Sequence, residues 1–157
     1  MSLIKAPRHV FIYNQSKETF LAFRVRVADS IVSRLVGLLG KRFLKPDSGV
    51  WIVPANSVHT IGMLFTFDLV LIDKDFTVVG LRELLRPFRI TRPNFRAESA
   101  IELPAHTIFK SRTEVGDKLV IDRYEARIEH SKEEAGVELA LQSSSPLPST
   151  DVLPHRP

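Results

Sequence analysis

The stretch from Val58 to Val79 constrains the fold more than any other part of this chain. Within it, residues 68–72 are apolar after an initial aspartate and lack the alternation of polar and apolar residues that marks a half-exposed strand. Such a run is typical of a central strand that is buried on both faces. Residues 73–75 can form a turn, from which residues 76–81 return as an antiparallel strand. The stretch therefore predicts the central hairpin of a β domain.

The segments on either side of this hairpin also favour strands. Residues 8–28 predict a first hairpin, because two β-rich runs flank turn-forming residues. Within residues 8–124, helical patterning is confined to residues 29–40 and to a single turn at residues 107–112, and residues 132–142 could form a marginal helix beyond them. Shorter strands are predicted at residues 50–53, 99–103 and 119–122. We therefore expect a mostly β, α+β fold, in which a small antiparallel β-sheet or partly closed barrel carries one or two short helices.

Length and composition indicate the domain organisation. A chain of 157 residues with 44% hydrophobic content suits one globular domain, which we place at residues 8–124. Residues 125–157 are charged and then rich in serine and proline, and at least the last 15 are expected to be disordered. The chain has no cysteine, which excludes disulfides and thiolate metal sites. No signal peptide and no apolar run of about 18 residues is present, so we expect a soluble, cytoplasmic protein.

The basic character of the chain is concentrated in one segment. The whole chain has a net charge of +4, and residues 81–96 alone account for it, because five arginines stand there against the single acid Glu83. Phe88 and Phe95 are interleaved with them, so guanidinium groups lie beside aromatic rings. This combination suits an anionic small molecule or protein partner. These candidate ligand-binding residues are Arg82, Arg86, Arg89, Arg92 and Arg96.

The arginines also allow a simpler interpretation, in which they form a solvated loop and pair with nearby acids. Nucleic acid is not the expected partner, because the total charge is modest and no helix-turn-helix, OB or RRM signature is present. Two further arginines, Arg24 and Arg26, alternate with apolar residues along the second predicted strand. We expect those two to face solvent rather than a ligand.

Three blocks of the sequence follow one another in a recognisable order: ADSIVSRLVGLLGKR (28–42), WIVPANSVHTIGMLFTFDLVLID (51–73) and AIELPAHTIFKSRTEVGDKL (100–119). In order and spacing they resemble the motifs of the domain-of-unknown-function family 192, also called the UPF 0127 family. The resemblance implies a small, mostly antiparallel β domain with one or two helices, and it implies no reaction. His106 departs from the pattern, because relatives often have glycine there, and glycine reaches a positive φ more readily.

Asp68 and His59 are the candidates for catalysis. Asp68 begins a strand that should be buried, so its carboxylate is either a general base or ligand anchor, or an acceptor of structural hydrogen bonds. His59 lies in a polar connection, where an imidazole could titrate or simply be satisfied by neighbours. Together with His106 they could offer two nitrogens and one oxygen to a metal, but their spacing matches no ligand pattern. We therefore predict no metal site and no cofactor.

Two classes of function remain open at this level. The first is a non-enzymatic binding or accessory module that holds an anionic ligand or partner through the arginines and the rim near His59. The second is a small enzyme that uses Asp68 and His59 in acid–base roles. No nucleophile elbow surrounds any serine, and no glycine loop for phosphate is present, so the sequence favours the binding module.

Overall fold

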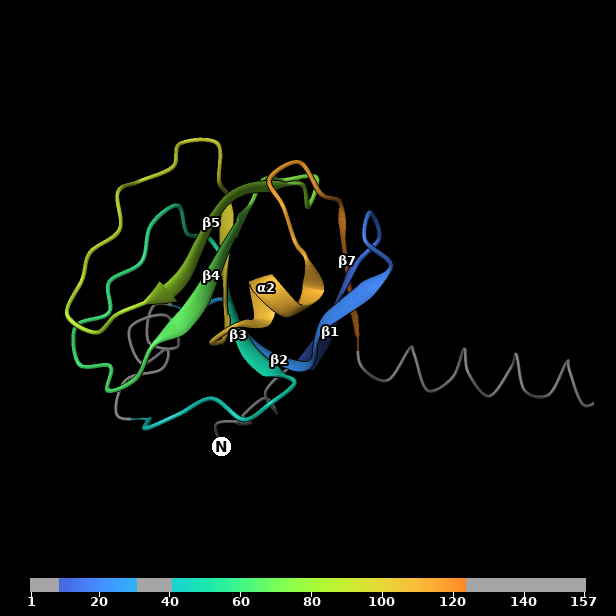
Figure 1. Ribbon diagram of the computed structural model, residues 1–157. Coiled ribbons are helices and arrows are strands. Elements are labelled where there is room, and N and C mark those ends of the chain that lie inside the picture. The colour runs from blue at the N-terminus through green and yellow to red at the C-terminus, as the bar shows by residue number, and fades with distance from the viewer. Residues whose placement is uncertain (1–8, 31–40, 124–157) are drawn as a thin grey trace, which may run out of the picture. The chain divides into compact units, whose positions relative to one another are not determined.

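The computed structural model describes residues 9–30 and 41–123, and these form a strongly curled, open β-sheet that resembles half of a barrel (Figure 1). Its strand order is β5-β4-β6-β3-β2-β1-β7, and all neighbours pair antiparallel except β2 and β3, which are parallel. The strands are β1 (His9–Asn14), β2 (Thr19–Ala28), β3 (Ser48–Ile52), β4 (Phe67–Ile72), β5 (Val78–Leu85), β6 (Ser99–Pro104) and β7 (Leu119–Arg123). A five-residue helix, α2 (Thr107–Ser111), follows β6. The predicted mostly β fold is confirmed.

The strand β4 is the predicted central strand. All six of its residues are buried, and it lies between β5 and β6. Its side chains alternate between two apolar clusters: Val70 and Ile72 pack into one, and Leu69 and Leu71 into the other. Burying a side chain of this size typically stabilises a fold by about 1.5–3 kcal/mol. The absence of polar alternation in the sequence therefore reflects a strand with apolar neighbours on both faces, as predicted.

The two edges of the sheet meet at one end. Thr77, just before β5, forms an antiparallel bridge with Lys118, just before β7. The backbone N–H of Val78 donates to the carbonyl oxygen of Asp117 at 2.9 Å, and that of Gly116 donates to the carbonyl of Val78 at 2.8 Å. These contacts join the ends of the two edge strands, β5 and β7, and they hold the curl of the sheet.

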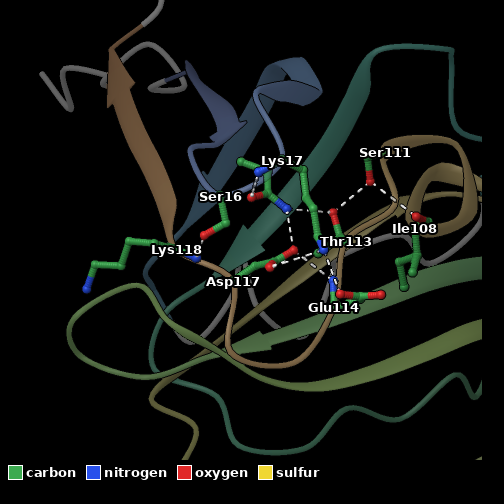
Figure 2. A network of polar contacts seen from close by, with 9 residues as sticks. Ser16, Lys17, Ile108, Ser111, Thr113, Glu114, Asp117 and Lys118 are labelled. Atoms are coloured by element: carbon green, nitrogen blue, oxygen red, sulfur yellow. Dashed lines mark hydrogen bonds and ion pairs between the residues drawn. The ribbon is translucent and has the colours of Figure 1, made fainter.

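A polar network supports this closure (Figure 2). The buried amide of Asn14, at the end of β1, donates to Thr113 Oγ1 at 3.2 Å and to Asp117 Oδ2 at 2.8 Å. Ser111 Oγ lies 2.7 Å from Thr113 Oγ1, and Lys17 Nζ lies 2.6 Å from Glu114 Oε2. Buried polar groups are stable only when paired, so the network fixes the β1–β2 turn against the α2–β7 connection.

Several predicted boundaries change. The returning strand was predicted to end at residue 81, but β5 continues to Leu85, because Arg82 and Leu85 pair with Leu69 and Phe67 of β4. Arg82 therefore lies on a strand. The predicted strand at 50–53 instead spans Ser48–Ile52. The predicted helix at 29–40, apart from its first two residues, and the tail at 125–157 lie outside the described residues.

The position where relatives often have glycine carries a strained backbone. His106 has φ 68° and ψ 8°, in the left-handed region, and it is the residue that precedes α2. A side chain in this region is disfavoured, whereas glycine adopts it readily. His106 thus takes, at an energetic cost, a conformation that glycine adopts readily.

His106→Gly should therefore make the protein more stable, by up to about 1 kcal/mol, because it relieves the strain. The control is Ala105→Gly, one residue earlier, where φ is not positive and the extra freedom of glycine should lower stability. Denaturant unfolding of the two variants and the wild-type protein measures both effects. Equal destabilisation by both substitutions would contradict the strain.

Candidate functional site

Four of the five predicted ligand-binding arginines lie around one depression. Arg82, Arg86, Arg89 and Arg92 line it, and its volume is about 540 Å³. Glu83 is the one acidic residue among the described residues that line it. Arg96 does not line it. We call the four arginines around this depression the arginine surface. The sequence showed only that the five arginines share one segment, and the structure places four of them around the same depression.

The buried threonine Thr60 fixes the backbone of this segment. Its Oγ1 accepts a hydrogen bond from the N–H of Arg89 at 2.7 Å and donates to the carbonyl oxygen of Arg86 at 2.9 Å. Its own N–H donates to the carbonyl of Arg89 at 2.8 Å, and its carbonyl accepts from Phe88 at 3.1 Å. Residues 86–89 are therefore held at both ends by one side chain, a role that no local pattern around Thr60 indicates.

His59 lies beside the same segment. It forms an isolated antiparallel bridge with Ile90. On one side of this bridge Thr91 N–H donates to the carbonyl of Val58 at 3.0 Å, and on the other Thr60 N–H donates to the carbonyl of Arg89 at 2.8 Å. Residues paired in this way direct their side chains to the same side. The exposed imidazole of His59 therefore lies near Ile90, which lines the depression. The structure therefore places His59 beside the segment that carries Arg86, Arg89 and Arg92.

Asp68 is placed differently. Its side chain is fully buried, and each carboxylate oxygen accepts a backbone hydrogen bond: Oδ1 from Leu84 at 3.0 Å and Oδ2 from Ile108 at 2.9 Å. Leu84 has φ 51°, near the end of β5, and Ile108 is the second residue of α2. Asp68 therefore connects α2 to the strand that leads into the arginine segment. These contacts favour the structural interpretation of this carboxylate.

A second buried carboxylate was not singled out by the sequence reasoning. Glu102 lies on β6, opposite Val50 of β3 and Leu69 of β4, and only 3% of it is exposed. Among the described residues, no donor lies within hydrogen-bond distance of its Oε2. Burial raises the pKa of Glu102 from 4.5 to about 7, against the opposing effect of Arg26 and Lys41. Glu102 is the one acid in the otherwise largely apolar strand predicted at residues 99–103, just as Asp68 is in residues 68–72. The same pattern could therefore have identified both as buried carboxylates.

A second basic feature lies beside β2 and β3. A groove of about 830 Å³ separates these strands from residues 41–47, and we call it the basic groove. Its charged lining residues are Arg24, Arg26, Lys41, Arg42, Lys45 and Asp47. The sequence interpretation assigned Arg24 and Arg26 to solvent. Arg24 is exposed and Arg26 is half-buried, and both line this groove, where the parallel pairing of β2 with β3 places them.

Across residues 9–30 and 41–123, no three side chains of the His, Cys, Asp or Glu type gather at one point. Within the same residues, no helix has the length and apolar character needed to cross a membrane.

The chain is similar in sequence to proteins of archaea. The family model DUF192, described as "Uncharacterized ACR", matches residues 12–121. A UPF0127 protein of Pyrococcus horikoshii is 36% identical over 114 residues, which cover 69% of this chain and 96% of that protein. A UPF0127 protein of Pyrococcus abyssi is 31% identical over 116 residues, which cover 69% of this chain and 94% of that protein.

Two crystal structures share the fold. A protein described as a putative transcription regulator from Sinorhizobium meliloti superimposes with a TM-score of 0.63 at 22% identity, covering 77% of this chain and 98% of that one. A protein of unknown function from Novosphingobium aromaticivorans gives a TM-score of 0.62 at 15% identity, covering 71% and 83%. At these identities the likeness concerns the fold alone.

Proposed function

Since this chain belongs to the DUF192 family of uncharacterised proteins, also named UPF0127, we propose a function from its own surface: it is a non-enzymatic module that binds an anionic ligand or partner through the arginine surface. The observation that carries the proposal is the convergence of Arg82, Arg86, Arg89 and Arg92 on one depression. Planar guanidinium groups match the geometry of phosphate and carboxylate, and the volume of the depression suits a small ligand.

The fixed backbone of the segment supports the same proposal. Flexible arginines lose conformational freedom when they bind, and a backbone that is already ordered reduces this loss. Thr60 supplies that order at residues 86–89, and Thr91 extends it by its contacts with Val58. The backbone that carries Arg86 and Arg89 is therefore ordered before any ligand arrives.

The enzyme alternative has less support. It requires Asp68 and His59 to act together, but both oxygens of Asp68 accept backbone hydrogen bonds in the interior, whereas His59 is exposed beside Ile90. The binding module can use His59 at the rim of the depression without any role for Asp68. We propose that this module works in the cytoplasm, and the absence of cysteine from the sequence is consistent with a reducing compartment.

Heparin is a suitable polyanionic probe for this surface. Arg86→Ala/Arg89→Ala should weaken heparin binding about tenfold or more at low salt and reduce its salt dependence, because fewer cations are displaced from the polyanion on binding. The matched control is Lys110→Ala/Arg123→Ala, which removes two exposed cations elsewhere and should have a much smaller effect. Equal weakening by both double variants, or none by either, would contradict the proposal.

Thr60→Val tests the role of the ordered backbone. It keeps every arginine and removes only the hydroxyl that holds Arg86 and Arg89. We expect heparin binding to weaken about threefold to tenfold, since the arginines must then be ordered on binding. Unchanged binding in a folded Thr60→Val protein would show that the arginines act as independent charges.

A further inference from the structure

The basic groove is shaped by a bulge in β2. Val10 pairs with Val25 and Ile12 with Ala22, so β2 has one more residue than β1 between these two pairs. The N–H groups of Phe23 and Arg24 both donate to the carbonyl oxygen of Asp47, each at 3.0 Å. A bulge of this kind redirects neighbouring side chains. Consequently Phe23 and Arg24, which would otherwise face opposite ways, both line the groove.

The opposite wall of the groove is held by a tight turn. The N–H of Ser48 donates to the carbonyl oxygen of Lys45 at 3.2 Å, and Ser48 Oγ donates to the same oxygen at 2.6 Å. Asp47 has φ 58° within this turn. The turn is thus fixed to β2 through the carbonyl of Asp47 and to itself through Ser48. This turn lies at the C-terminal end of residues 41–47, the segment that contributes Lys41, Arg42 and Lys45 to the groove.

Aromatic rings stand at both walls. The ring of Phe23 packs on Phe20, with centroids 4.6 Å apart, and Phe20 packs on Tyr13 at 4.8 Å. This contact limits the orientations open to Phe23. Across the groove, the ring of Phe43 is 66% exposed. Aromatic rings fixed beside cations provide a stacking surface for a planar heterocycle next to a site for its phosphates.

From these features we infer that the basic groove binds a small ligand that carries both a planar aromatic ring and phosphate groups, a nucleotide being the representative. The cations outnumber the single carboxylate of Asp47 among the described lining residues, and the phosphates lie against them. The ring stacks beside Phe23 and Phe43. The volume of about 830 Å³ lies in the range of small-molecule sites. This site shares no residue with the arginine surface and does not depend on its function.

The inference is tested with three probes on the full chain: ATP, inorganic tripolyphosphate and adenosine. Calorimetric titration should give the tightest binding for ATP. Tripolyphosphate should bind about tenfold more weakly, because it lacks the ring, and adenosine about a hundredfold more weakly, because it lacks the charges. Phe43→Ala should weaken ATP binding by about fivefold or more and leave tripolyphosphate binding unchanged.

Two double variants with equal loss of charge locate the site. Arg24→Ala/Lys45→Ala should weaken ATP binding about tenfold or more, whereas Lys110→Ala/Arg123→Ala, which removes two exposed cations outside both basic sites, should change it less than about twofold. All of the substituted side chains are exposed, so every variant should fold, and thermal melting checks this.

Three results would overturn the inference. The first is no binding of ATP to the wild-type chain at millimolar concentration. The second is equal affinity for ATP and tripolyphosphate, which would show that the aromatic ring of the ligand contributes nothing to binding. The third is loss of ATP binding in Arg86→Ala/Arg89→Ala with retention in Arg24→Ala/Lys45→Ala, which would assign the nucleotide to the arginine surface and support the proposed function instead.

Discussion

Asp68→Asn should destabilise the protein by about 2–4 kcal/mol, although the new side chain has the same shape. The carboxylate accepts hydrogen bonds from Leu84 and Ile108 with its two oxygens, and an amide can replace only one of them. The amide nitrogen would then face a second backbone N–H in the interior. Denaturant unfolding, read as a change in the midpoint at constant slope, measures the loss.

Asp75→Asn is the matched control for this substitution. Asp75 is an exposed acid in the β4–β5 turn, so its conversion to an amide should change stability by less than about 0.5 kcal/mol. Near-wild-type stability of Asp68→Asn would show that the carboxylate is not needed to hold α2 and β5 together. It would then return Asp68 to consideration as a catalytic group.

Glu102→Gln should change how stability depends on pH. The pKa of Glu102 is raised by burial from 4.5 to about 7, so the folded state retains a proton in this interval that the unfolded state has lost. Wild-type stability from this group is therefore greatest below pH 4.5 and falls as the pH rises through about 7. The difference amounts to about 3 kcal/mol, and glutamine, which cannot ionise, removes it.

The measurement is the stability of Glu102→Gln minus that of the wild-type protein at several pH values. This difference should increase by about 3 kcal/mol between pH 4.5 and pH 8. The corresponding difference for Glu98→Gln should stay nearly flat, because Glu98 is exposed. A flat difference would mean that the folded and unfolded states bind this proton equally, and a difference that decreases with pH would mean that the folded state stabilises the ionised carboxylate.

The sequence predicted best where the signal is local. The apolar run of β4 and the turn at Asp73 could be predicted because each depends on residues adjacent in the chain. In the turn, Asp73 Oδ1 accepts hydrogen bonds from the N–H groups of Asp75 and Thr77, both at 2.9 Å. The length of β5 could not be predicted in this way, because its charged end is a strand only through its pairing with β4.

The candidate sites likewise differ in how far they depend on contacts between residues that are distant in the chain. Five arginines on one segment were visible in the sequence, but their arrangement around a depression depends on Thr60, which lies more than twenty residues earlier. The basic groove was missed altogether. Arg24 alternates with apolar residues as a solvent-facing side chain would, and only the bulge and the parallel neighbour β3 direct it into a groove.

By itself, the sequence determined the β class of this protein, its central hairpin and its family, because apolar periodicity, turn residues and motif order are all properties of neighbouring residues. The tertiary structure decided what the charged and polar side chains do. Asp68 is bonded to two backbone amides 16 and 40 residues away, and Glu102 is enclosed between strands from distant parts of the chain. Hydrogen bonding and desolvation depend on which groups meet in space, and that is fixed only when the sheet has curled.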